Sequence, residues 1–446
     1  MSMNAKAETK QKGSLFEMEG TPGIGEVLPL ALQHVVAMIV GCVTPAIIVS
    51  NAASLSDADK VLMIQSALVV AALSTLLQVY GIGKKNGFHI GFRLPVIMGI
   101  SFAYVPSMQA IAGTGGVASI LGAQIVGGIM AVIVGIFVKK IQRFFPPLIT
   151  GTVVFTIGLS LYPTAVNYMA GGSSSADYGA PLNWVISIVT LGVVVALNHY
   201  GKGIVKLASI LIGIVVGYVI AAFCGLVNFS SAASAAWFSV PQPFHFGVVF
   251  DPAACVAIGL LFVINSIQAI GDITATTTGS MDRYPSGEEL KSGIIGYGMT
   301  NIIGAMLGGL PTASFSQNVG IVTTTKVVNR CVFGLAALVI LIAGLVPKFS
   351  AILTTIPQCV LGGATITVFA SIAMTGMRLI NTEKMNYRNT SIVGLSVALG
   401  MGISQCQAAL ASFPDAVTII VGKSPVVVAT LIALLLNSIL PKEMDS

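Results

Sequence analysis

Charged side chains are scarce in this sequence. Aspartate, glutamate, lysine and arginine make up 9% of the 446 residues, whereas 55% of the residues are hydrophobic. A soluble domain carries roughly 25% charged residues, so this scarcity excludes an ordinary soluble fold and indicates a polytopic membrane protein. The formal net charge of +6 does not indicate nucleic-acid binding, because the basic residues are spread over short loops.

Several chemical motifs are missing as well. The six cysteines lie in or beside apolar runs and form no Cys-x-x-Cys pair, so the sequence predicts neither a disulfide framework nor a zinc site. A Walker A sequence, a Gly-x-Ser-x-Gly elbow and a His-Glu-x-x-His pair are all missing, which argues against an ATP-driven pump and against an enzyme. We expect no catalytic residue, metal or cofactor. We also expect no cleavable signal peptide, because residues 1–25 are mostly polar.

Long apolar runs fill most of the remaining sequence. A helix needs about 20 apolar residues to cross a bilayer, so the sequence predicts an all-α membrane fold of about fourteen segments. The third and tenth segments are short and rich in polar or helix-breaking residues, and we expect short strand-like pieces in both. The predicted segments span residues 26–49, 60–80, 92–108, 116–138, 146–165, 182–199, 204–226, 253–275, 292–310, 313–325, 331–351, 358–379, 389–406 and 423–440.

The placement of basic residues supports this segment count. If the N-terminus lies inside, the inside loops and segment ends carry most lysines and arginines, and the outside carries only Lys60, Lys348 and Lys423. This asymmetry is what the positive-inside rule describes. We therefore expect a multi-pass protein of the inner membrane, surrounded by the lipid bilayer, with both termini in the cytoplasm.

The two halves of the chain resemble each other weakly. Residues 144–151 (Phe-Phe-Pro-Pro-Leu-Ile-Thr-Gly) resemble residues 355–362 (Thr-Ile-Pro-Gln-Cys-Val-Leu-Gly), and each stretch opens a predicted segment. Two repeats of seven segments have opposite orientations in the membrane because seven is odd, which is the inverted-repeat arrangement of secondary transporters. The alternative is that the two stretches share only a proline followed by a glycine, which is a common opening of membrane helices.

Asp272 is an exception among the sixteen acidic residues, because nearly all the others fall in tails, loops or segment ends. An ionisable residue inside a membrane segment indicates a functional site. Gln268 lies four residues earlier, so the two side chains share one helical face. Either this face lines the path of a substrate or ion, or Asp272 only caps or braces a neighbouring helix.

The tenth segment contains the most informative pattern, the amide- and hydroxyl-rich run 317–326. A membrane interior admits such a run only where it faces protein, water or substrate. In the broken third segment, Ser101 precedes Phe102, whose aromatic face suits a flat polar ligand. A packing role for Phe102 is the alternative. His34, alone in the apolar first segment, either contacts the substrate or serves as a structural hydrogen-bonding group.

The run Gln317-Asn318-Val319-Gly320, followed by four residues that end in threonine and then by Thr325 and Lys326, resembles the signature of the nucleobase–ascorbate transporter family. Gln33-His34 and residues 271–275 (Gly-Asp-Ile-Thr-Ala) occur in the family's order, and the resemblance covers residues 26–440. It implies fourteen helices in a seven-plus-seven inverted repeat, a homodimer, and an elevator-like movement of a core domain against a gate domain. The implied parts are an N-terminal cytoplasmic tail (1–25), the core (26–138 and 253–351) and the gate (146–226 and 358–440).

The resemblance also implies roles for single residues. Gln317 matches the amide that hydrogen-bonds the purine in xanthine and urate carriers, and Phe102 matches the stacking aromatic residue. An amide presents a donor and an acceptor, which suits the adjacent N–H and C=O of an oxidised purine. The other matching residues are Ser101 beside the aromatic residue, Ser316 with its backbone N–H, Asn318 as a positioning group, and His34 in the first segment.

Two positions depart from the family's pattern. Gln268 stands where the family usually has a glutamate that binds the ring and is implicated in proton coupling, and Tyr297 stands where several purine carriers have aspartate. An amide can hydrogen-bond a purine but cannot take up a proton. Coupling through Asp272 or a sodium ion, uncoupled transport, and an engineered change that traps one state all remain open.

The sequence thus predicts a secondary-active permease, in the simplest case a proton symporter, for xanthine or uric acid. The substrate is expected between Phe102, Gln268 and Gln317. A carrier of uracil, ascorbate or an anion is the alternative, although an anion site would favour a basic residue in the tenth segment, where Lys326 lies only at the end. A channel or a receptor is disfavoured, because the sequence lacks a repeated pore motif and a sizeable soluble domain.

Overall fold

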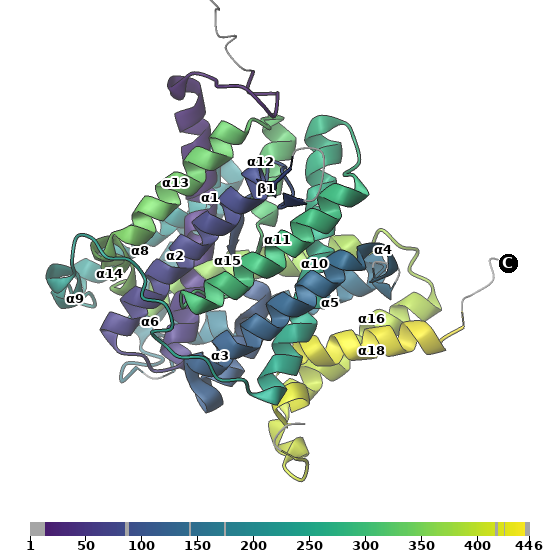
Figure 1. Cartoon of the computed structure of the whole chain (residues 1–446). Helices are drawn as coiled ribbons and strands as arrows, with labels where there is room; N and C mark the ends of the chain where they lie inside the picture. The colour runs from purple at the N-terminus through teal and green to yellow at the C-terminus, as the bar shows by residue number, and fades with distance from the viewer. Residues whose placement is uncertain are drawn as a thin grey trace, which may run out of the picture.

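The computed structural model describes residues 14–84, 89–141, 144–173, 175–414, 418–422 and 424–441. The N-terminal stretch 1–13 of the predicted tail and the predicted outside residue Lys423 lie outside the described residues. The fold is mostly helical (Figure 1), as the sequence predicts.

Among the residues that the structure describes, seven helices are long and apolar enough to cross a membrane. They are α1 (Ile24–Ala52), α2 (Asp57–Tyr80), α3 (Val105–Ile136) with the preceding turn η1 (Phe102–Tyr104), α5 (Pro147–Met169), α6 (Pro181–Tyr200), α10 (Pro252–Met281) and α15 (Gln358–Ile380). The bent pair α13 (Arg330–Leu345) and α14 (Pro347–Thr354) would make an eighth, and α8 (Ser209–Phe223) and α18 (Pro425–Ile439) are apolar but shorter. These helices make the chain a multi-pass membrane protein.

The remaining helices and the strands connect and interrupt these helices. The helical ones are α4 (Val138–Ile141), α7 (Ile204–Leu207), α9 (Ser230–Ser234), α11 (Gly287–Met306), α12 (Ser316–Thr325), α16 (Tyr387–Gln405), η3 (Gln407–Leu410) and η4 (Thr418–Gly422). The strands are β1 (Ile82–Gly83), β2 (His89–Ile90), β3 (Met98–Ile100) and β4 (Thr312–Ser314). Strand β3 lies in the third predicted segment, and β4 begins one residue before the tenth and includes its first two residues, Ala313 and Ser314.

Several predicted segments differ from the structure, and two of the differences change the course of a helix. The loop expected over residues 109–115 is helical, and α3 is interrupted only at Gly116, whose φ of 68° and ψ of −174° are accessible to glycine. The segment expected over 331–351 is bent by 78° between α13 and α14. Pro347 explains the bend, because a proline disfavours helical geometry at the residue before it, and Val346 has a ψ of 94°.

The helices pack in two groups. The first group contains α1, α2, α3, α10, α11, α12, α13 and α14, and the second contains α5, α6, α8, α15, α16 and α18. In Figure 1 the purple α1 and the blue α2 run beside the green α13, whereas the yellow-green α16 and the yellow α18 lie together at one side. In the second group α5 and α15 approach closely, because a Cβ on Gly158 would lie 2.4 Å from the backbone nitrogen of Ala373.

Strands β3 and β4 pair inside the first group. They are antiparallel, with Met98 opposite Ser314 and Ile100 opposite Thr312. Two further hydrogen bonds continue the ladder symmetrically. The Ser101 N–H donates to the Pro311 carbonyl at 3.0 Å, and the Phe315 N–H donates to the Ile97 carbonyl at 3.0 Å. The two broken segments therefore satisfy each other's backbone groups, which a membrane interior requires.

One side chain satisfies the other edge of each strand. Thr75 of α2 accepts a hydrogen bond from the Met98 N–H at 2.9 Å, and its hydroxyl lies 3.2 Å from the Met98 carbonyl oxygen. Asn301 of α11 accepts from the Thr312 N–H at 2.8 Å and donates to the Thr312 carbonyl at 3.4 Å. In each half, a side chain from the preceding helix therefore hydrogen-bonds the backbone groups on the outer edge of the strand.

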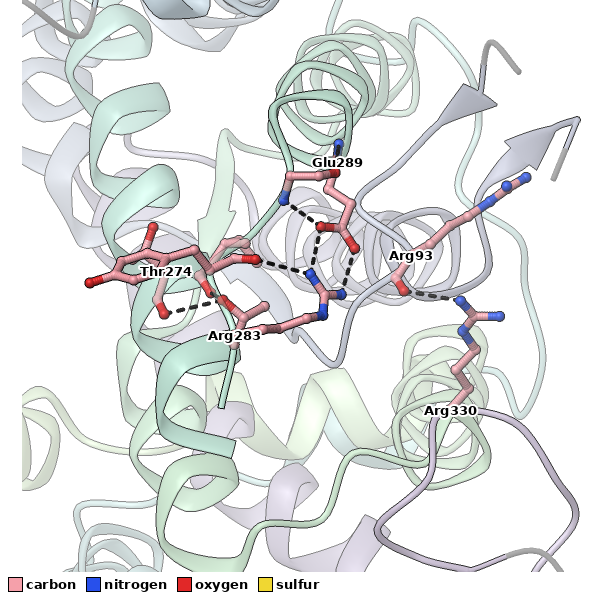
Figure 2. A network of polar contacts seen from close by, with 9 residues as sticks. Arg93, Thr274, Arg283, Glu289 and Arg330 are labelled. Carbon is pink, nitrogen blue, oxygen red and sulfur yellow. Dashed lines mark hydrogen bonds and ion pairs between the residues drawn. The ribbon is translucent and has the colours of Figure 1, made fainter. Parts of the chain in front are cut away.

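A polar cluster fixes the turn between α10 and α11 (Figure 2). Arg283 donates to both carboxylate oxygens of Glu289, at 2.9 and 2.7 Å. Glu289 accepts from the Ser286 N–H at 2.7 Å while Ser286 accepts from the Glu289 N–H at 3.1 Å, which is a capping box. Nearby, Arg330 of α13 donates to the Arg93 carbonyl at 3.0 Å. The bonds of Arg283 and Ser286 fix the turn into α11, and the bond of Arg330 links α13 to the chain before β3.

Replacing Asn301 by alanine should destabilise the protein. Asn301 is fully buried, and the substitution leaves the N–H and the carbonyl of Thr312 without this partner, at a cost of roughly 1–3 kcal/mol. We expect the melting temperature of the purified protein in detergent to fall by several degrees. Asn381→Ala, at an exposed position after α15, is the control. Equal melting temperatures for both variants would contradict this role.

Candidate functional site

The strand pair ends at a cavity of about 200 Å³ that lies between the two helix groups. An apolar cavity of roughly 150 Å³ can hold a benzene-sized ring, so this volume suits a small flat heterocycle. The first group lines the cavity with Ser101, Phe102, Gln268, Ser314, Ser316 and Gln317 among others. The second group lines it with Val154 and Ile157 of α5 and with Ser371, Ile372 and Thr375 of α15.

Gln268 and Gln317 reach this cavity from different elements. Gln268 lies in the middle of α10 and is partly buried, whereas Gln317 is the second residue of α12 and is exposed. Neither side-chain amide has a hydrogen-bond partner among the described residues. Each amide has a carbonyl acceptor and an N–H₂ donor. Both amides are therefore free to hydrogen-bond a polar ring.

Two helical segments begin at the cavity. Strand β3 leads through Ser101, whose hydroxyl accepts from the Ala103 N–H at 3.3 Å, into η1 and α3. Strand β4 leads through Phe315 into α12. The first N–H groups of a helix lack partners within the helix, and the helix dipole is positive at this end. Both starts therefore offer hydrogen-bond donors and partial positive charge.

Two aromatic rings, those of Phe102 and Phe315, line the cavity. Phe102 packs edge-on against Phe369 of α15, with ring centroids 5.3 Å apart and planes at 74°. Phe315 lies between α1 and β3, where a Cβ on Gly41 would lie 2.5 Å and a Cβ on Gly99 would lie 2.3 Å from its ring. Only glycine leaves room for this ring at both positions. Phe102 and Phe315 both line the cavity, so a flat ligand can meet an aromatic side chain there.

Asp272 lies one helical turn from Gln268 on α10, and it is not among the residues that line the cavity. Its carboxylate accepts one hydrogen bond from the Ser316 hydroxyl of α12 at 2.9 Å and another from the Ser314 hydroxyl of β4. Gln317 follows Ser316 directly. The carboxylate therefore links α10 to the element that carries one of the cavity amides.

His34 and Asn318 also lie away from the cavity lining. The Asn318 side-chain nitrogen is 2.9 Å from His34 Nδ1 and donates to the His34 carbonyl at 3.2 Å. The His34 ring packs against Phe333 of α13, with ring centroids 4.8 Å apart. Both side chains are buried. The two neighbouring amides of the signature thus face opposite ways, Gln317 into the cavity and Asn318 toward α1.

The sequence reasoning missed the second wall of the cavity. Ser371 and Thr375 are four residues apart on α15 and exposed, and two hydroxyls on one face of an apolar segment were the available signal. It also missed the partner of Tyr297. The hydroxyls of Tyr297 and Tyr104 lie 2.5 Å apart, and both side chains are fully buried. This neutral pair joins α11 to η1, two residues after Phe102.

Within the part of the chain that the structure describes, no group of three or more histidine, cysteine, aspartate or glutamate side chains could hold a metal ion. The polar groups of the cavity are amides, hydroxyls and helix N-termini. Such groups recognise an uncharged or weakly acidic polar ring by hydrogen bonds.

Solved structures of membrane transporters share this fold. The transmembrane domain of a bicarbonate transporter from a cyanobacterium superposes with a TM-score of 0.56 at 15% identity, covering 92% of this chain and 97% of that one. A murine anion transporter of solute carrier family 26 in the inward-facing state superposes with a TM-score of 0.61 at 10% identity, covering 92% of this chain and 68% of that one. At such low identity the likeness shows the fold alone.

Sequence comparison places the chain among permeases. A model of a family described as the Permease family matches residues 25–409. The xanthine permease of Bacillus subtilis is 33% identical over 93% of this chain and 94% of its own length. A uric acid permease of the same organism is 33% identical over 93% and 95%, and a xanthine permease of Escherichia coli is 32% identical over 96% and 94%. The chain therefore belongs to the Permease family of membrane transporters, the nucleobase–ascorbate transporters whose signature it resembles, and it is a transporter rather than an enzyme.

Proposed function

We propose that this chain is a secondary-active permease for an oxidised purine, either xanthine or uric acid or both. Relatives that match almost its whole length are named xanthine and uric acid permeases. The observation that carries the proposal is the placement of Gln268 and Gln317 at one cavity of ring size, where neither amide has a hydrogen-bond partner among the described residues. Oxidised purines present alternating N–H and C=O groups around a flat ring, which are the groups that amides recognise.

In the proposed complex the ring lies against Phe102, near the middle of the membrane. The amides of Gln268 and Gln317 hydrogen-bond its polar edges, and Ser101 and the Ser316 N–H add contacts at the two helical starts. Asn318 and His34 lie outside the residues that contact the ring, and the hydrogen bonds between them hold α12 against α1. They position Gln317 without touching the ring.

We propose that the fold comprises fourteen segments in an inverted repeat. The matched roles of Thr75 and Asn301 beside β3 and β4 support this arrangement, because they recur at equivalent places in the two halves. The core then corresponds to the first helix group (26–138 and 253–351) and the gate to the second (146–226 and 358–440). The proposal includes an inner-membrane location, cytoplasmic termini and a homodimer.

Transport requires the cavity to open to each side in turn, and we propose an elevator-like movement of the core against the gate. Neutral hydrogen bonds join the two groups, among them Asn51 to Tyr168 at 3.3 Å and Thr164 to Gln109 at 3.2 Å. Each such bond contributes only about 1 kcal/mol net, so the interface can break and re-form. In the proposed topology both bonds lie in the outer half of the membrane.

Ion coupling is assigned to Asp272 in this proposal, because Gln268 cannot take up a proton. Protonation of Asp272 would turn one acceptor oxygen into a donor, so it could no longer accept from both Ser314 and Ser316. The resulting shift of α12 would move Gln317 and change the affinity for the purine. A sodium ion at the same carboxylate, or uncoupled transport, is the alternative.

Gln317→Ala should lose most purine binding. A buried polar edge of the ring would lose its partner at a cost of roughly 1–3 kcal/mol, which corresponds to about a 5- to 150-fold weaker affinity. Binding of radiolabelled xanthine and urate to the purified protein measures this effect. Gln405→Ala, at an exposed position at the end of α16, is the control. Unchanged binding in Gln317→Ala would count heavily against the site.

Asp272→Asn should abolish purine accumulation driven by an inward proton gradient while purine exchange continues. Uptake into proteoliposomes, with and without the gradient, measures both activities. Asp177→Asn, in the exposed turn after α5, is the control. Gradient-driven accumulation that survives in Asp272→Asn would contradict coupling through this carboxylate. Accumulation that is absent in the unmodified chain and appears only in Gln268→Glu would also contradict it, and would place the proton site at position 268.

A further inference from the structure

The wall of the cavity opposite the two glutamines is formed largely by α15. Ser371 and Thr375 lie on this wall one helical turn apart, and both are exposed in the cavity. The other lining side chains from the second group, Val154, Ile157 and Ile372, are apolar. The two hydroxyls therefore supply the polar side-chain atoms of this wall.

Both hydroxyls already donate a hydrogen bond to a backbone carbonyl of α15. The Ser371 hydroxyl donates to the Thr367 carbonyl at 2.8 Å, and the Thr375 hydroxyl donates to the Ser371 carbonyl at 2.9 Å. A hydroxyl has one proton and two lone pairs, so each oxygen now presents only an acceptor to the cavity. The opposite wall differs, because the amides of Gln268 and Gln317 present both donors and acceptors.

We propose that Ser371 and Thr375 are specificity-determining residues that accept hydrogen bonds from ring N–H groups on the edge of the substrate that faces α15. This inference rests on the proposed purine transport and deepens it. An edge that carries an N–H is favoured on this wall. An edge that presents a carbonyl or a bare ring nitrogen is disfavoured, because its lone pairs would face the hydroxyl oxygens.

The contact is made across the interface between the two helix groups. Gln268 and Gln317 belong to the first group and α15 to the second, so a ring that moves with the core leaves these hydroxyls behind. Their effect is thus confined to the conformation in which the core holds the purine beside α15. The amides hold the ring, and the two hydroxyls select which ring is accepted in that conformation.

The test pairs protein variants with modified substrates. Wild-type protein, Ser371→Ala and Thr375→Val are compared for xanthine and for a series of monomethylated xanthines, each of which lacks one ring N–H. The affinity of each compound is measured by competition with radiolabelled xanthine uptake in proteoliposomes. Thr367→Val, on α15 but outside the cavity lining, and Ser391→Ala, on α16, are the matched controls, since their hydroxyls also bond backbone carbonyls.

Methylation of the N–H that faces α15 should weaken binding to the wild type roughly three- to tenfold. The same methylation should reduce the affinity by a smaller factor in Ser371→Ala or Thr375→Val, because the variant no longer makes the hydrogen bond that methylation removes. Such non-additivity is the signature of a direct contact. Thr375→Ser retains the hydroxyl and should retain the wild-type pattern, which separates the contact from a loss of folding.

If the wild type transports xanthine or urate normally, the inference is overturned when methylation weakens binding to Ser371→Ala and Thr375→Val as much as it weakens binding to the wild type and the two controls. A wild-type protein that transports neither purine would overturn the proposed function, and the inference with it. The two failures are distinguished by the wild-type measurement alone.

Discussion

The structure depends on hydrogen-bonding the backbone N–H and C=O groups of two segments whose helices are interrupted inside a membrane protein. A helix that stops inside the bilayer exposes N–H and C=O groups that lipid cannot satisfy. Here β3 and β4 pair with each other, and Thr75 and Asn301 complete their outer edges. This solution lets η1 and α12 begin inside the protein, so their donor-rich starts meet at a cavity rather than at the membrane surface.

The chemistry of the cavity follows from the residues near the first turns of η1 and α12. Gln317 is the second residue of α12 and Gln268 lines the same cavity from α10, so two neutral amides stand among the polar groups of the cavity. The carboxylate of Asp272, which does not line the cavity, accepts hydrogen bonds from two residues that do, Ser314 and Ser316. The amide proposed for recognition, Gln268, and the carboxylate proposed for coupling, Asp272, are therefore one turn of α10 apart, and Ser316, next to Gln317, bonds the carboxylate.

The sequence predicted the first wall of the cavity because polar residues are conspicuous inside apolar segments. Gln268, Gln317 and Phe102 come from three distant segments, and the structure brings them to one place. The second wall was not predictable in this way, since a serine or threonine in a membrane helix usually bonds its own backbone, as Ser371 and Thr375 do. Strand register and the bend before α14 depend on tertiary contacts and local proline geometry, which an apolar-run count does not contain.

The purine is proposed to lie between the paired broken segments and α15, and a structure of the protein determined with bound xanthine would reveal its position. We expect the ring against Phe102, with the amides of Gln268 and Gln317 at hydrogen-bonding distance from its polar edges. A purine bound elsewhere, with Gln317 out of reach of the ring, would show that the proposed site is wrong.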